Sequence, residues 1–294
     1  MNNNKQIYNR QHAILSDWYK YGVGHTYKRY FINKIIKFIE NKQDISSILD
    51  LGCGEGSNTY FISTKFIADK VVGIDITEEG VKKAKLNFPN IDFIQLNLDK
   101  IELQNMDTYD LVCSFDVLEH VDDWENLLHK MTVICNKYIL ITVPTGRMRD
   151  YEVSIGHLRN FKKGEIENFL NNNNFRTIKT FYGGFPFYSP LGRDYLNRNH
   201  KNYEESITGD FTNKQKIFHR MLYILFRYFC FDNIGDMFTG LFIKDNITTN
   251  SNGGGYSHPN NNLNEYLIII ISVRMQKCIR TLFYFKNLLG EIDG

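Results

Sequence analysis

Nine consecutive residues constrain the fold of this chain more than any other feature, because they join a buried strand to a glycine-rich turn. Ile48–Leu51 is apolar except for Asp50, and the run continues as Gly-Cys-Gly-Glu-Gly to Gly56. Glycine lets the backbone approach a ligand closely, since it has no Cβ. Nineteen residues later (56 to 75), a second apolar run ends in Asp75. An acid about 20 positions after such a turn is where doubly wound folds hold a nucleoside ribose.

The spacing of the glycines separates two classes of nucleotide ligand. A dinucleotide-binding turn reads G-x-G-x-x-G, whereas Gly52, Gly54 and Gly56 follow the pattern G-x-G-x-G. The carboxylate of Asp50, two residues before the first glycine, would repel a pyrophosphate but can hold an ammonium group. The pattern therefore predicts a nucleoside with a cationic amino-acid tail, which describes S-adenosylmethionine (SAM). It disfavours a nicotinamide dehydrogenase.

Four segments in order resemble the motifs of class I SAM-dependent methyltransferases. They are Asp50–Gly56, Gly73–Ile76, the pair Asn97-Leu98, and Phe115–Val121. The resemblance covers about residues 45–185 and returns at 265–275. It implies SAM as the cofactor, with these residues binding it: Asp50, Gly52, Cys53, Gly54, Gly56, Asp75, Ile76, Asn97, Leu98 and Phe115. Asn97 stands where the family usually has an acid that contacts the adenine.

Apolar runs of strand length alternate with amphipathic segments of helix length along the first 185 residues. This pattern predicts an α/β fold, with a doubly wound, Rossmann-like sheet whose ligand lies beyond the carboxyl ends of the strands. The resemblance implies seven strands with the last one antiparallel. We expect the sixth strand at Phe175–Gly183 and the seventh at Tyr266–Val273, some 80 residues later (183 to 266), with a helical insertion between them.

The predicted organisation has four parts. These are an N-terminal helical cap over 1–42, a SAM-binding core over 43–184, a helical and Asn/Gly/Ser-rich insertion over 185–263, and a last strand with a basic helix over 264–294. Within the insertion, 214–231 reads as a helix with a wide apolar face. That face suits packing on the sheet or on a second subunit as in a homodimer, a lid over a bulky acceptor, or a bilayer surface.

Composition narrows the partners and the compartment. The 294 residues are 43% hydrophobic with a net charge of +2, so neither a strongly basic nucleic-acid binder nor an acidic protein is indicated. Five scattered cysteines without a C-x-x-C pair argue against disulfides and zinc. We find no secretory signal and no long apolar span, so we expect a cytoplasmic protein, with a peripheral contact at the inner face of the membrane left open. No Pro-Pro run follows the fourth strand, which argues against DNA bases as acceptors.

Two segments supply candidate catalytic residues. Asp116, Glu119 and His120 form a D-x-x-E-H cluster, which either braces the loop beneath SAM or supplies a base or a metal site. The cluster is similar to the metal-binding E-x-x-E-H of ubiquinone-pathway O-methyltransferases and of small-RNA 2′-O-methyltransferases, although Asp replaces the first Glu. We assign no metal here. His157, in Gly-His-x-Arg-x-Phe, either acts as a general base or fixes the loop backbone.

The catalytic candidates are thus His157, His120 and Glu119, and the acceptor-pocket candidates are Tyr151, Arg159, Tyr182 and Tyr188. The resemblance implies methyl transfer from SAM to a hydroxyl, or less favourably an amine, of a small-molecule or glycan acceptor in a bacterial pathway. Two alternatives stay open. One is metal-assisted 2′-O-methylation of RNA, and the other is a SAM-binding partner protein without catalysis.

Overall fold

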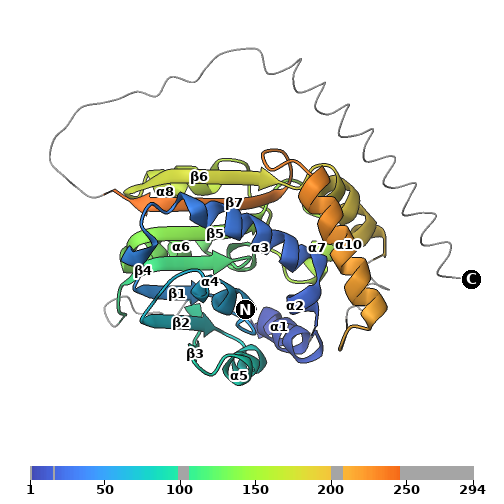
Figure 1. Cartoon of the computed structure of the whole chain (residues 1–294), viewed down its shortest axis with the longest axis horizontal. Coiled ribbons are helices and arrows are strands. Elements are labelled where there is room, and N and C mark those ends of the chain that lie inside the picture. The colour runs from blue at the N-terminus through green and yellow to red at the C-terminus, as the bar shows by residue number, and fades with distance from the viewer. Residues whose placement is uncertain (1, 16, 99–105, 200–207, 246–294) are drawn as a thin grey trace, which may run out of the picture. The chain divides into compact units, whose positions relative to one another are not determined.

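The computed structural model describes residues 2–15, 17–98, 106–199 and 208–245, and these build one seven-stranded sheet with the order β3-β2-β1-β4-β5-β7-β6 (Figure 1). The strands are β1 (Ser47–Leu51), β2 (Lys70–Asp75), β3 (Asp92–Gln95), β4 (Tyr109–Phe115), β5 (Cys135–Pro144), β6 (Phe175–Gly183) and β7 (Met237–Lys244). β7 runs antiparallel to both β5 and β6, and the other pairs are parallel. The predicted fold class is confirmed.

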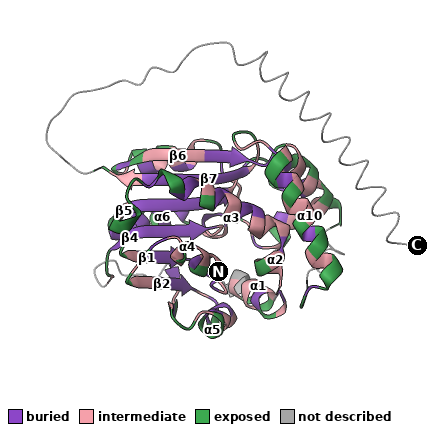
Figure 2. Cartoon of the chain, viewed as in Figure 1, coloured by how far each residue is buried: buried purple, intermediate pink, exposed green. Residues whose placement is uncertain are grey.

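Helices cover both faces of this sheet. Their bounds are α1 (Asn2–Ile14), α2 (Trp18–Tyr21), α3 (Val23–Ile35), α4 (Ser57–Ser63), α5 (Glu78–Asn87), α6 (Trp124–Ile134), α7 (Asp150–Ser154), α8 (Glu165–Asn171) and α10 (Asn213–Phe229), with short turns η1 (Ile36–Phe38), η2 (Lys42–Asp44), η5 (Leu118–His120) and η6 (Phe187–Gly192). One core lies between the sheet and α6 and α8, and the other lies between the sheet and α3. Figure 2 shows the central strands β4, β5 and β7 largely buried between these layers, whereas the edge strand β6 is only partly buried.

The central strands are apolar because both of their faces are covered. All seven positions of β4 are buried, including Val112 and Cys113, which are completely inaccessible. A parallel strand buried on both sides reads as a continuous apolar run rather than an alternating one. β4 pairs with β1 and β5, so the carboxyl ends of the three strands open on the same edge, where the ligand is expected.

The position of the last strand corrects our prediction. The seventh strand is Met237–Lys244, inside the range assigned to the insertion, and it fills the space between β5 and β6. The predicted strand at Tyr266–Val273 lies outside the described residues, as do the expected basic helix and the Asn/Gly/Ser-rich stretch. The stretch 266–273 contains four consecutive isoleucines, which are a stronger local strand signal than Met237–Lys244 with Thr239 and Gly240 in its middle. The sheet tolerates that interruption because β7 is paired on both sides.

The predicted helices at the N-terminus and in the connection from β6 to β7 are present. α3 buries Tyr27, Phe31 and Ile35 against the sheet. α10 begins with a capping box in which Thr212 and Gln215 bond each other's backbone N–H groups. It packs against α3 through Phe226, whose ring meets the ring of Tyr27 edge-on at 5.5 Å. No helix among the described residues is long and apolar enough to cross a membrane.

Candidate active site

The glycine-rich turn after β1 adopts a conformation that requires glycine. Gly52 has φ +81° and Gly54 has φ +54°, both in the left-handed region. A Cβ on Gly52 would come within 2.2 Å of the Val117 side chain, and one on Gly54 within 2.8 Å of the His12 ring. The backbone N–H groups of Gly52 and Cys53 donate to the Ile74 carbonyl at 2.7 and 3.0 Å, which ties the turn to the end of β2. Glycine is therefore required here by the backbone conformation and by the side chains packed against the turn.

Two buried carboxylates flank the turn, and one of them keeps a free acceptor. Asp75 accepts from the Gly54 N–H at 2.8 Å and from the Thr77 N–H and hydroxyl at 2.8 and 2.6 Å. Asp50 accepts from the Thr59 hydroxyl at 2.6 Å, but its Oδ1 is buried with no hydrogen-bond partner. Burial raises the pKa of Asp50 to about 7. A cationic group placed there would restore the charged carboxylate, as the predicted amino-acid tail of SAM requires.

The remaining predicted cofactor residues lie at neighbouring strand ends. Ile76 follows β2, while Asn97 and Leu98 follow β3 and Phe115 ends β4. Cys53 is buried in the turn, and burial holds the pKa of its thiol well above the ordinary value, so it is a small packing group rather than a nucleophile. Strand ends that meet at one edge can surround a nucleoside.

The first helix closes over this edge, which the sequence did not predict in detail. The His12 ring lies on Gly54, and Lys83 donates to the His12 carbonyl. Asn9 accepts from the Glu79 N–H at 3.3 Å. The Tyr8 hydroxyl lies 2.8 Å from Nδ1 of His120. α1 therefore contacts the cofactor turn, α5 and the candidate catalytic cluster together.

The three predicted catalytic side chains come together in space. Glu119 and His120 lie on η5, and His157 follows α7, yet their ligand-type atoms all lie within 4.8 Å of one another. The two imidazole rings meet edge-on at 4.6 Å. Glu119 is completely buried, and neither of its carboxylate oxygens has a hydrogen-bond partner in the part of the chain that the structure describes. A buried carboxylate without partners is costly, so this site is built for a further group.

Hydrogen bonds fix the His120 ring. The Gly156 carbonyl lies 3.0 Å from Nδ1 of His120, and because a carbonyl only accepts, we assign the proton to Nδ1. Nε2 then carries a lone pair toward the cluster. Burial lowers the pKa of His120 to about 3 and that of His157 to about 4. Both rings are therefore neutral at pH 7. Burial also raises the pKa of Glu119 to about 8, so its carboxyl is mostly protonated at pH 7.

Asp116 does not join this cluster. It has φ +56° and forms an ion pair with Lys28 of α3, and it accepts from the Thr142 hydroxyl at 3.1 Å. Its role is to tie the end of β4 to α3 and β5. The D-x-x-E-H pattern is therefore divided between a structural acid and two members of the cluster.

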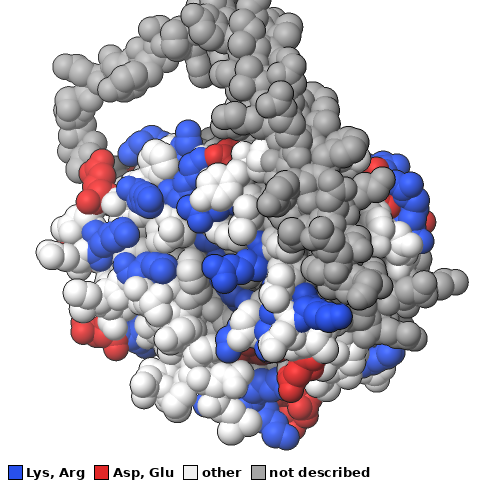
Figure 3. All heavy atoms as spheres, turned by 45° about the vertical axis from the view of Figure 1, so that its right-hand side comes forward, with Lys and Arg blue, Asp and Glu red and all other residues white. Residues whose placement is uncertain are grey.

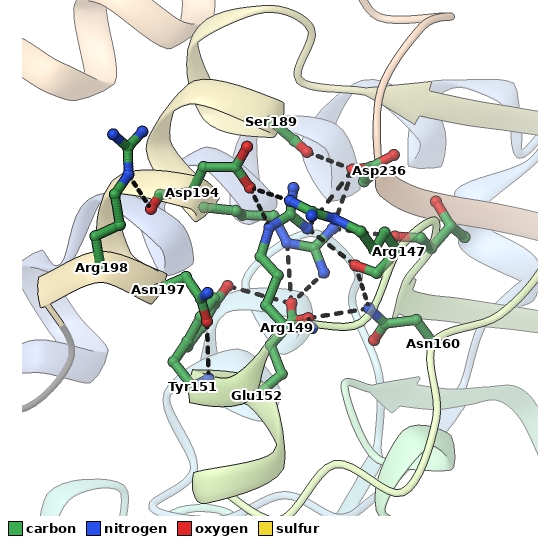
Figure 4. Close-up of polar contacts among 12 residues, drawn as sticks. Arg147, Arg149, Tyr151, Glu152, Asn160, Ser189, Asp194, Asn197, Arg198 and Asp236 are labelled. Atoms are coloured by element: carbon green, nitrogen blue, oxygen red, sulfur yellow. Dashed lines mark hydrogen bonds and ion pairs between the residues drawn. The ribbon is translucent and has the colours of Figure 1, made fainter.

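A buried polar network holds the loop that carries His157 (Figure 4). The Glu152 carboxylate accepts hydrogen bonds from Nε and Nη2 of Arg193. It also accepts from the backbone N–H of Arg149 at 2.8 Å and from the side-chain amide of Asn160 at 3.1 Å. Arg193 also donates to the Thr145 carbonyl at 3.0 Å. Glu152 and Arg193 are each only 2% exposed. The network fastens α7 and the segment after it to the end of β5.

A cleft of about 760 Å³ opens beside this network. Its lining includes the predicted acceptor residues Arg159 and Tyr182, together with Lys162, Lys163 and Phe161. Asp236 also lines it, but that carboxylate pairs with Arg193 at 3.3 Å. Tyr151 and Tyr188 do not line the cleft. The Tyr151 hydroxyl bonds Glu152 at 3.2 Å, and Tyr188 packs among Tyr27 and Phe226.

Sequence reasoning missed Tyr8, His12, Lys28 and the Glu152–Arg193 pair. None of them lies in a recognisable motif. The single usable signal is the absence of acids from the first sixteen residues, which marks α1 as a segment that can lie beside an acidic pocket.

Comparison with known proteins agrees with this geometry. A family model described as a methyltransferase domain matches residues 23–180. Pavine N-methyltransferase from Thalictrum flavum subsp. glaucum is 33% identical over 108 residues, which are 34% of this chain and 29% of that protein. Malonyl-[acyl-carrier protein] O-methyltransferase 2 from Ilyobacter polytropus is 27% identical over 103 residues, which are 34% of this chain and 39% of that protein. The matches thus span about a third of these relatives.

A solved structure supports the fold. A chain from the complex between the Haloferax volcanii Trm112 methyltransferase activator and a methyltransferase superposes with a TM-score of 0.51 at 13% identity. The match covers 81% of this chain and 98% of that one. At this identity the likeness concerns the fold alone.

Proposed function

This chain belongs to the methyltransferase domain family as a class I SAM-dependent methyltransferase, and we propose that it methylates a hydroxyl group of a small-molecule or glycan acceptor. The observation that carries the proposal is the cluster of Glu119, His120 and His157 at the edge that holds the cofactor turn. The relatives include both an N-methyltransferase and an O-methyltransferase, so they do not choose the accepting atom.

Each part of the edge has a role in this proposal. SAM supplies an electrophilic methyl group on a sulfonium. Asp50 would hold the ammonium of its amino-acid tail through the free Oδ1. Asp75 already accepts three hydrogen bonds and would accept from one ribose hydroxyl with the lone pair left on Oδ2. The residues after β3 lie beside the adenine. Holding the methyl carbon about 3 Å from the acceptor oxygen supplies most of the rate acceleration.

The proton of the acceptor needs a destination, and the cluster offers one. When the acceptor oxygen forms its bond to the methyl carbon, the carbon–sulfur bond breaks and S-adenosylhomocysteine is released. In its ionised form Glu119 would receive the hydroxyl proton directly or through an imidazole. Burial raises the pKa of Glu119 to about 8, so this form is the minority at pH 7 and increases as the pH rises. A buried base is useful for a hydroxyl and dispensable for an amine.

The same cluster supports a second candidate function, metal-assisted 2′-O-methylation of RNA. One carboxylate and two neutral imidazoles suit a divalent ion such as Mn²⁺, and the Gly156 carbonyl orients His120 as the outer partner of a metal-bound histidine does. The partnerless oxygens of Glu119 fit such an ion. Glu119, His120 and His157 would hold the metal, which would lower the pKa of a bound hydroxyl. This candidate requires turnover that depends on added metal.

The cleft beside Asn160 is the proposed site of the distal part of the acceptor. It lies within a few residues of His157 along the chain, and three extended residues span at most about 10 Å. Arg159, Lys162 and Lys163 give it a positive rim, while Phe161 contributes an apolar surface. An acceptor that carries a polar or anionic ring at some distance from its reacting hydroxyl suits this arrangement. We place the reaction in the cytoplasm.

Methyl transfer from labelled SAM to a panel of sugars, nucleotide sugars, phenols and short RNAs tests the proposal, with and without EDTA and with added Mn²⁺. We expect a hydroxyl acceptor and a large loss of turnover in Glu119→Gln and His157→Gln, with SAM affinity unchanged. Turnover on an amine that is insensitive to both substitutions would contradict the proposal. Normal SAM binding without turnover on any acceptor would favour a non-catalytic SAM-binding protein.

A further inference from the structure

Helix α10 is apolar on two sides, and only one of them packs on the protein. The buried side carries His219 and Phe226, which face α2 and α3. From the sequence we expected this helix to pack on the sheet or on a second subunit, whereas its buried side packs on other helices of the same chain. The second side lies on the opposite face, and the sequence pattern did not separate the two.

The outer side of α10 exposes a stripe of large apolar side chains. Ile217, Ile224 and Tyr228 are 60%, 42% and 58% exposed. Their spacing of seven and four residues places them on one line along a helix. Phe218 lies beside them and is 49% exposed. A continuous exposed apolar stripe of this length marks an interaction surface rather than scattered surface residues.

The charges around this stripe have one sign. Lys214, Arg220 and Arg227 are exposed, and Asn213–Phe229 contains no Asp or Glu. In Figure 3, where the side that carries α10 in Figure 1 is turned forward, Lys and Arg spread over the middle of the visible face and Asp and Glu lie mostly at its margins. A basic helix with exposed Ile, Phe and Tyr matches the composition of helices that lie in a membrane interface.

A second cleft adjoins the stripe and could hold a phosphate. It measures about 500 Å³ and is lined by Arg29, Lys216 and Arg220, with the rings of Tyr21 and Tyr223. Lys216 pairs with Asp17 at 2.9 Å, and Asp17 does not line the cleft. No acid is among the residues that line it. An anionic headgroup would therefore find cations beside the stripe.

We propose that α10 binds the surface of an anionic bilayer, with the Ile217–Tyr228 stripe among the upper acyl chains and a lipid phosphate in the cleft of Arg29 and Arg220. This surface also backs onto the cofactor site, because Arg29 donates to Asn58 of α4 at 3.1 Å. The inference deepens the proposed function by naming where the enzyme works. It does not depend on the accepting atom.

Flotation of the purified full chain with phospholipid vesicles tests this inference. We expect it to float with vesicles of phosphatidylcholine and phosphatidylglycerol at low salt, and not with phosphatidylcholine alone. Arg220→Gln with Arg227→Gln should lower the partition coefficient about twenty-five-fold, since each basic residue near an anionic surface contributes about a factor of five. Ile217→Ser with Ile224→Ser should abolish flotation at high salt as well as at low salt.

A matched control uses an exposed apolar and basic patch on another helix. Leu86→Ser with Lys82→Gln and Lys85→Gln on α5 removes an exposed aliphatic side chain and two exposed cations and should leave flotation unchanged. SAM titration reports folding of every variant, and the readout needs no methyl transfer, so failure here is distinct from failure of the proposed function. No flotation, equal flotation of all variants, or a dimer that the stripe variants dissociate would overturn the inference.

Discussion

Replacing Glu152 by glutamine removes the charge at the centre of the polar network while keeping its shape. Glu152 and Arg193 have side chains that are 2% and 3% exposed and bond each other directly. Removing one partner of a buried ion pair leaves an uncompensated charge and costs about 3–5 kcal/mol. Asp236 lies 3.3 Å from the same guanidinium and still balances part of its charge. We therefore expect a loss at the low end, about 3 kcal/mol in the free energy of unfolding.

Two assays read this prediction. Urea unfolding gives the free energy, and thermal unfolding should shift by about 6–12 °C, at about 2–4 °C per kcal/mol for a domain of this size. Because the Asn160 amide also loses its charged acceptor, the His157 loop should shift. Turnover should fall about ten- to a hundredfold, with SAM affinity within twofold of the wild type.

An exposed ion pair provides the control. Arg176 and Asp245 are 3.7 Å apart with side chains 65% and 57% exposed, so Asp245→Asn should cost less than about 1 kcal/mol. Adding Arg193→Met to Glu152→Gln should cost less than the sum of the two single changes, because no buried charge is then left unpaired. A loss below about 1 kcal/mol in Glu152→Gln, or equal losses in both pairs, would refute the reasoning.

Three further predictions concern the cofactor edge. Gly52→Ala places a Cβ 2.2 Å from Val117 at φ +81°, so SAM affinity measured by calorimetry should fall at least tenfold, and wild-type affinity would contradict the strained turn. Tyr8→Phe removes a hydroxyl 2.8 Å from His120 and should speed SAM release in stopped-flow fluorescence, whereas an unchanged rate would argue against closure by α1. Burial holds the pKa of His157 at about 4, against 6.5 in the unfolded chain. Between these two pH values His157 is protonated in the unfolded chain and neutral in the folded chain. Because of this histidine, the free energy of unfolding falls by up to about 1.4 kcal/mol per pH unit as the pH falls toward 4. His157→Gln should flatten this decline when measured on protein treated with a chelator.

Most of the sheet was predictable from the sequence because its strands are local apolar runs. The predicted strand Phe175–Gly183 is confirmed at both ends. The last strand was not predicted correctly because pairing with two neighbouring strands, rather than local composition, selects Met237–Lys244. A run of isoleucines elsewhere was the stronger local signal.

The site was predictable where a motif encodes it and not where distant residues build it. The glycine turn and Asp75 follow from spacing alone. The approach of His157 to His120 depends on how α7 folds back. Glu152 and Arg193 are 41 residues apart and pair only in the folded chain, where Arg193 also bonds the Thr145 carbonyl after β5. Tyr8 and Lys28 come from helices that could not be placed before the fold was known.

Calorimetric titration with SAM, S-adenosylhomocysteine and NAD, on the wild type and on Asp75→Ala, tests the central claim most directly. The account predicts that the first two ligands bind the wild type, that NAD does not, and that Asp75→Ala loses both while remaining folded by circular dichroism. Binding of NAD alone, or SAM affinity that survives the loss of Asp75, would contradict the assignment of the cofactor edge and of the chemistry built on it.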